Sequence, residues 1–222
     1  NLQNEEFVKV LFSLAGRLWN MGLTFLLTPV FIHYLGFEAY GLIGFFVLVQ
    51  GILMILEFGI PLSLNRAISR LRAEIDSHST ISSILKTFEL VFITLAILIV
   101  LFIALPSSYL SDFLFTGQDL DQGIISISIF LIILQVALRF PIIIYQAALT
   151  GFQKIVPLNL LTIFFSSIRL FGSALLLIYF EIDIAEFFTY QIIIVFLELI
   201  ITRLVCWSED NLNSKVPFRI KH

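Results

Sequence analysis

The chain has 222 residues, of which 59% are hydrophobic and 13% are charged, and its mean hydropathy is +1.02. Soluble domains carry about 25% charged residues, so this composition excludes a fully water-exposed surface and indicates an integral membrane protein. The net charge of −3, with no basic stripe along the chain, argues against nucleic acid as a partner.

Six apolar stretches are each long enough to cross a bilayer as a helix, which takes about 20 residues. In chain order they are Val10–Ile32, Tyr40–Leu62, Phe88–Leu105, Ile124–Thr150, Leu158–Phe180 and Ala185–Trp207. A transmembrane barrel would instead show short segments of alternating polarity. The sequence therefore predicts an all-α, polytopic membrane protein. Its bundle of six transmembrane helices would occupy residues 1–207, and residues 208–222 would form a cytoplasmic tail or linker.

Basic and acidic connections alternate along the chain. The bases near the span ends are Lys9, Arg66, Arg70, Arg72, Lys86, Lys154, Arg203, Lys215, Arg219 and Lys221. The first, third and fifth connections contain no Lys or Arg, and their charged residues are Glu38, Asp112, Asp119, Asp121, Glu181 and Asp183. The positive-inside rule makes the basic side cytoplasmic. Both termini are then expected in the cytoplasm, in agreement with an even number of spans.

Polar side chains recur at helical spacing inside three of the spans. The sets are Ser13, Arg17, Asn20, Thr24 and Thr28; Ser128, Gln135, Arg139, Gln146 and Thr150; and Asn159, Thr162, Ser166, Arg169 and Ser173. Such spacing places each set on one face of its helix. A charge at mid-membrane costs about 2.5–3.5 kcal/mol on insertion scales. We therefore expect these faces to point into a shared interior.

Arginine predominates among the mid-span charges, because only Glu57 and Glu198 oppose the three arginines. Guanidinium groups bind phosphate oxygens through two parallel hydrogen bonds, so this excess predicts a cavity for an anionic ligand. The expected substrate-binding residues are Arg17, Asn20, Gln135, Arg139 and Arg169. Glu57 and Glu198 either balance the arginines or couple transport to an ion. The alternative for the whole set is that these side chains only hold the helices together.

Other chemistry has little support in the sequence. Arg66 and Arg70 share a helical face just beyond the second span, where they either bind lipid phosphates at the inner leaflet or act only as topology determinants. Cys206 is the only cysteine, and neither a Walker-type loop nor a metal-binding motif occurs. We therefore expect no metal, no cofactor and no enzymatic activity.

Three short motifs follow one another along the chain. They are Tyr34-Leu35-Gly36-Phe37-Glu38-Ala39-Tyr40-Gly41-Leu42, then Leu56-Glu57-Phe58-Gly59-Ile60 with Leu64-Asn65-Arg66, then Ala148-Leu149-Thr150-Gly151-Phe152-Gln153-Lys154. Together they resemble polysaccharide-export flippases, including the O-antigen (Wzx-type) flippases of the multidrug/oligosaccharidyl-lipid/polysaccharide exporter superfamily. In the first motif, Gly36 and Gly41 would permit a tight outer turn. In the second, Gly59 and Pro61 would break the inner end of the second helix.

The resemblance implies a transporter of two six-helix lobes, of which this chain supplies the first. It implies alternating access and an undecaprenyl-diphosphate-linked oligosaccharide as substrate, moved across the bacterial plasma membrane for polysaccharide, O-antigen or lipopolysaccharide biosynthesis. The mid-span arginines would then meet the diphosphate or the sugar. Two alternatives remain. A multidrug or cation antiporter of the same superfamily would need an acidic cavity, and a membrane-embedded saccharide polymerase would need a large extramembrane loop or carboxylates beside a metal.

Overall fold

The computed structural model describes residues 2–56, 59–72, 78–104 and 121–215, with residues 107, 109 and 111. Side chains are described for a subset of these, which excludes residues 2–13, 17, 53–56, 78, 103–104 and 209–215. The elements are α1 (Leu2–Leu56), α2 (Ile60–Leu71), α3 (His78–Ile99), a π-helix η1 (Val100–Ala104), α5 (Gln122–Gly151), α6 (Ile155–Phe180) and α7 (Ile184–Lys215). The described part of the chain contains no strand, so the all-α prediction is confirmed.

Five helices within the described residues are long and apolar enough to cross a membrane. The qualifying stretches are Leu14–Ile52, Ser79–Phe102, Gln122–Gly151, Ile155–Phe180 and Ile184–Ser208. Their exposed surfaces carry many Leu, Ile and Phe side chains, as expected of helices in contact with acyl chains. Several such helices in one chain are typical of a multi-pass membrane protein.

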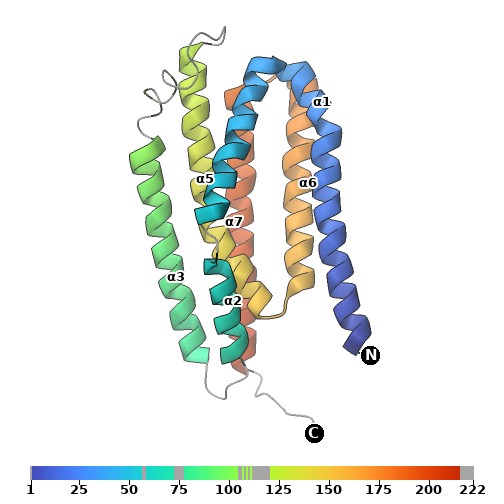
Figure 1. Ribbon diagram of the computed structural model, residues 1–222, viewed down its shortest axis with the longest axis vertical. Helices are drawn as coiled ribbons and strands as arrows, with labels where there is room; N and C mark the ends of the chain where they lie inside the picture. Colours follow the sequence, from blue (N-terminus) through green and yellow to red (C-terminus); the bar gives the residue numbers. More distant parts are fainter. Residues whose placement is uncertain are drawn as a thin grey trace.

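The helix α1 contains the first predicted span and most of the second, and it is interrupted at Gly36. This glycine has φ 80° and ψ 167°, a combination that is essentially restricted to glycine. Two helical limbs flank it, and Figure 1 shows them as blue and cyan ribbons that run in opposite directions from the upper turn. Gly41, which was expected to share this turn, lies in regular helix instead, because Gly36 alone supplies the reversal.

A second glycine, Gly59, separates α1 from α2. It has φ 98°, and Pro61 follows within the first turn of α2, where a missing N–H breaks no helical hydrogen bond. The break predicted at Gly59 and Pro61 is therefore confirmed. It falls inside the predicted second span Tyr40–Leu62, which is consequently not one continuous helix.

Three helices extend well beyond the apolar runs that predicted them. α1 begins at Leu2 instead of Val10, α3 begins at His78 instead of Phe88, and α7 continues past Trp207 to Lys215. In the early part of α3, Ile81 and Leu85 are buried in the core within a largely polar stretch. Hydropathy detects only the apolar portion of a helix, whereas backbone hydrogen bonding continues into its polar ends.

The helix α5 forms the centre of the bundle. It makes its most extensive contacts with α7 and also packs on α3 and α2, while α1 packs mainly on α6. Ile129 and Ile132 of α5 belong to one buried apolar cluster with Phe187 and Phe188 of α7. A second cluster joins the other half of α5 to α2, α3 and Cys206 of α7. Side chains on α5 are therefore the best placed to meet several helices at once.

The basic connections and the acidic connections lie at opposite ends of the bundle. Figure 1 shows that α1 begins and α7 ends at the lower end of the bundle, where α2 and the α5–α6 turn also lie. α2 and this turn carry Arg66, Arg70, Arg72 and Lys154. The opposite end carries Glu38, Asp121, Glu181 and Asp183. The alternation of charge along the sequence thus corresponds to two ends of one bundle.

Candidate functional site

Polar side chains are buried between α5, α6 and α7, although these helices are otherwise strongly apolar. The buried members are Ser128 and Gln135 on α5, Ser166 and Ser173 on α6, and Gln191, Glu198 and Thr202 on α7. We call this set, together with Arg139 and Arg169, the polar layer. Burying polar groups costs free energy unless they are hydrogen-bonded. Two contacts show how the layer meets that requirement.

The first contact joins two glutamines. Gln135 Nε2 donates a hydrogen bond to Gln191 Oε1 at 2.9 Å, and both side chains are buried. The remaining amide oxygen of Gln135 and the hydroxyl of Ser128, two helical turns away on the same helix, have no hydrogen-bond partner among the described residues. The α5 side of the layer therefore retains hydrogen-bonding capacity that the described residues do not use.

The second contact is an ion pair between α6 and α7. Arg169 Nη1 lies 3.5 Å from Glu198 Oε2, and the two side chains are only 16% and 11% exposed. Charge-assisted N–H···O bonds are usually about 2.7–2.9 Å long. The pair is thus close enough to balance charge, but it is longer than an optimal hydrogen-bonded pair.

Arg139 brings a second positive charge to the same place. It lies on α5 one helical turn after Gln135, and its charge acts on Arg169. The structure therefore brings together Arg139 and Arg169, which were predicted from helical spacing, and Glu198, which was predicted to balance the arginines or to couple transport to an ion.

The predicted residues on α1 have a different setting. Asn20 is half-buried, and its carbonyl accepts a hydrogen bond from the hydroxyl of Thr24 at 2.9 Å. Trp19, beside it, donates to the hydroxyl of Ser167 on α6 at 2.9 Å. The side chain of Arg17 and the whole of Glu57 lie outside the described residues. The first limb of α1 thus borders α6, while the polar layer is formed by α5, α6 and α7.

The predicted phosphate contacts, Arg66 and Arg70, are exposed on α2. Their neighbour Arg72 has a different role, because its guanidinium donates to the carbonyl of Phe152 just beyond the end of α5. A methyl group added at Gly151 would lie 2.9 Å from the Cβ atom of Ile68, so α2 packs closely on the α5–α6 turn. Arg72 and Gly151 hold α2 in place and leave Arg66 and Arg70 at the surface.

No protein-family model matches this chain, and no curated protein or solved structure shows a significant match to it. Its function therefore has to be inferred from the polar layer and from the charges at the two ends of the bundle. Among the described residues, no group of three or more His, Cys, Asp or Glu side chains could hold a metal ion.

A further polar cluster joins three helices and was not predicted. Arg203 Nε on α7 donates to Glu89 Oε1 on α3 at 2.9 Å, and the buried hydroxyl of Tyr145 on α5 hydrogen-bonds to the same carboxylate. From the sequence, Arg203 was assigned only to the cytoplasmic charge pattern. A lone carboxylate in an apolar span requires a partner, and that requirement is the signal that could have revealed the cluster.

Proposed function

We propose that this chain is the N-terminal six-helix lobe of a flippase. Its substrate would be an undecaprenyl-diphosphate-linked oligosaccharide, carried across the bacterial plasma membrane by alternating access for polysaccharide or O-antigen biosynthesis. The observation that supports this most is the polar layer, in which Arg139 and Arg169 lie near each other and near Glu198 at mid-bundle depth. Two guanidinium groups at that depth favour an anionic ligand such as a diphosphate.

The helix arrangement supports a topology of six crossings. If each limb of α1 on either side of Gly36 crosses once, then with α3, α5, α6 and α7 the chain crosses six times. The start of α1 and the end of α7 would then lie on one side of the membrane; in Figure 1 both are at the lower end of the bundle. The bases of α2 and of the α5–α6 turn are at that end, which the positive-inside rule makes cytoplasmic.

Binding would proceed by exchange of ion-pair partners. The 3.5 Å separation between Arg169 and Glu198 is longer than a strong charge-assisted bond, so a phosphate oxygen can replace the carboxylate at small cost. Gln135 has an amide oxygen without a partner among the described residues, and it can accept a hydrogen bond from a sugar hydroxyl. The lipid tail would remain in the bilayer while a second six-helix lobe closes over the head group.

Glu198 would gain a second role when the substrate binds. Once Arg169 turns to a phosphate, the carboxylate loses its nearest described counter-charge in a partly buried position. The released carboxylate could then hold a cation, which would provide a route to ion-driven transport.

Reconstitution of the complete transporter in proteoliposomes tests this proposal. The measured quantity is the rate at which a fluorescent polyprenyl-diphosphate oligosaccharide becomes accessible to a quencher on the opposite side. We expect Arg139→Ala and Arg169→Ala to slow transport about 10–100-fold, the loss expected for one charged hydrogen bond. The control Lys154→Gln, a change at the α5–α6 turn, should retain the parent rate.

Unchanged transport in both arginine variants would refute the site, even if the protein flips lipids. Transport of organic cations in the same vesicles, without transport of the lipid-linked sugar, would instead identify the multidrug antiporter. Polymerised saccharide product would identify the membrane enzyme.

A further inference from the structure

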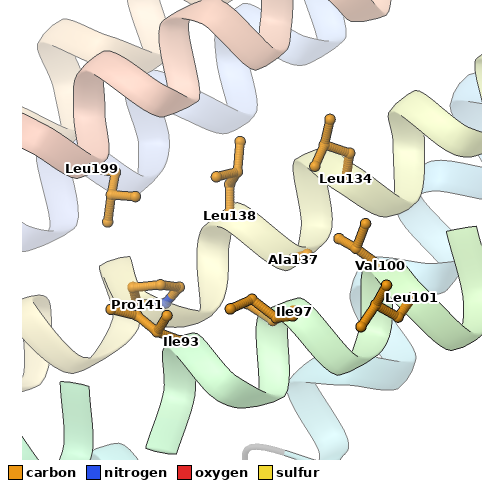
Figure 2. A pocket seen from close by; sticks show the side chains of 10 residues that line it. Ile93, Ile97, Val100, Leu101, Leu134, Ala137, Leu138, Pro141 and Leu199 are labelled. Carbon is orange, nitrogen blue, oxygen red and sulfur yellow. The ribbon is translucent and has the colours of Figure 1, made fainter. Parts of the chain in front are cut away.

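An apolar pocket lies on the opposite side of α5 from most of the polar layer, between α3, η1 and α5, with Leu199 of α7 also lining it. Figure 2 shows Ile97 and Leu101 of the α3–η1 segment on one side of this space and Leu134 and Leu138 of α5 on the other. Its volume is about 410 Å³ and every lining residue is apolar. That volume is within the range of roughly 300–1,000 Å³ typical of small-molecule sites.

The pocket opens to the outside of the bundle and is bordered by two helix irregularities. Ile97 and Leu101 on its rim are both about half exposed, so a ligand can enter sideways from the membrane. Pro141 lacks the N–H that would bond to the carbonyl of Ala137, and η1 replaces the last turn of α3 with a π-helix. Departures of this kind from regular helix are frequent at functional sites.

Basic side chains lie below the pocket along the seam between α3 and α7. Arg203 follows Leu199 by one helical turn, or about 6 Å along the axis, and its side chain is 55% exposed. Its Nε atom is bonded to Glu89, which fixes the guanidinium in this position. Trp207 follows Arg203 by one further turn of α7, and Nζ of Lys86 on α3 lies 5.9 Å from the centre of the Trp207 ring.

The charge of this seam favours an anion. Lys86 and Arg203 contribute two positive charges, whereas Glu89 contributes one negative charge. Tryptophan side chains prefer the interface between acyl chains and water, so Trp207 marks the level at which lipid head groups begin. The bases are thus at head-group depth, and the apolar pocket starts about one helical turn deeper in the membrane.

We propose that the apolar pocket and the basic seam next to it together form a specific binding site for an anionic phospholipid of the membrane. One acyl chain occupies the apolar pocket, and the phosphate is held by Arg203 and Lys86. The site is separate from the polar layer, so it does not depend on the proposed transport activity. It provides a fixed lipid that fills the space between α3 and α5 and ties both helices to α7.

Photo-crosslinking of the purified full-length protein tests this site. Phosphatidylglycerol and phosphatidylcholine, each with a diazirine in the same acyl chain, are added separately in detergent, and the labelled peptides are identified by mass spectrometry. We expect phosphatidylglycerol to label residues 93–101 and 134–141 several times more strongly than phosphatidylcholine. Lys86→Gln and Arg203→Gln should each reduce this labelling about fivefold, and Ala96→Phe should reduce it by filling the pocket.

Two controls keep the result interpretable. Lys154→Gln removes a base from the same end of the bundle but not from this seam, and it should label like the parent protein. Lys86 is exposed, so its variant remains informative even if Arg203→Gln unfolds the Glu89 cluster. Equal labelling by the two phospholipids, or phosphatidylglycerol labelling that survives Lys86→Gln, overturns the proposal. Displacement of the label by a polyprenyl diphosphate, but not by excess phosphatidylglycerol, overturns it as well.

Discussion

Arg169 and Glu198 meet across the α6–α7 interface at 3.5 Å, with the like charge of Arg139 acting on the same arginine from α5. The two partners are therefore not equivalent. Removing Glu198 leaves two guanidinium groups near each other without that carboxylate, whereas removing Arg169 leaves one base and one acid. We expect Glu198→Gln to lower the melting temperature in detergent clearly more than Arg169→Gln.

Breaking a buried ion pair costs about 3–5 kcal/mol, so both losses should be measurable by thermal unfolding. The double variant Arg169→Gln with Glu198→Gln should recover part of the stability lost in Glu198→Gln, because it also removes the repulsion with Arg139. Equal losses in the two single variants would show that Arg139 does not contribute to the energetics of this pair.

Gly172 allows α6 and α7 to approach closely at Tyr190. The tyrosine hydroxyl donates to the carbonyl of Ile168 at 2.8 Å, and a methyl group added at Gly172 would overlap that hydroxyl. We expect Gly172→Ala to destabilise the protein by about 1–3 kcal/mol, the usual cost of overpacking. Gly44→Ala is the matched control, since nothing lies within 4 Å of the added methyl group; it should be neutral or stabilising.

Helical spacing was sufficient to predict that polar faces of α5 and α6 point into the protein. Gln135 and Arg139 recur at the steps of one face of α5, and Arg169 lies on a similar face of α6. A membrane-spanning helix must direct such a face toward other protein. Chain order and charge likewise predicted the two ends of the bundle, because bases and acids alternate between connections. These features depend on local periodicity, which a single sequence contains.

Features that depend on a tertiary partner could not be predicted in the same way. Nothing in the spacing of α3 indicates that Glu89 meets Arg203 and Tyr145, because the three belong to helices far apart in the chain. The apolar pocket beside Pro141 also escapes sequence analysis, since its shape arises from the way α3, η1 and α5 pack. Helix ends such as His78 were missed because polar residues continue a helix that hydropathy no longer detects.

The reversal at Gly36 gives a direct test of the turn between the two limbs of α1. With φ 80° and ψ 167°, any side chain there adopts a strained backbone that costs about 1–3 kcal/mol. We expect Gly36→Ala to lower the unfolding temperature and Gly41→Ala to leave it unchanged or raise it, because Gly41 lies in regular helix with nothing within 4 Å of an added methyl group. A larger loss in Gly41→Ala would contradict the turn as described.

The placement of the basic and acidic connections at opposite ends of the bundle predicts how cysteines introduced there will react. In a Cys206→Ser background, we expect Glu181→Cys to react with a membrane-impermeant maleimide added to intact cells. Lys154→Cys, at the basic end, should react only after the cells are permeabilised. Reaction of both residues from outside would contradict both the six-crossing topology and the cytoplasmic position of the bases.

Variants of the hydrogen bond between Gln135 and Gln191 can distinguish a structural role of the polar layer from a role in substrate binding. Replacing one glutamine by Met leaves the other buried amide without its partner, which costs about 1–3 kcal/mol, whereas replacing both by residues of similar shape is nearly neutral. We therefore expect Gln135→Met and Gln191→Met each to lower the melting temperature, and the double variant to recover most of that loss. If the layer also binds sugar hydroxyls, the stable double variant will still transport the lipid-linked oligosaccharide much more slowly. A double variant with parent stability and parent transport would mean that these glutamines serve only to hold α5 and α7 together.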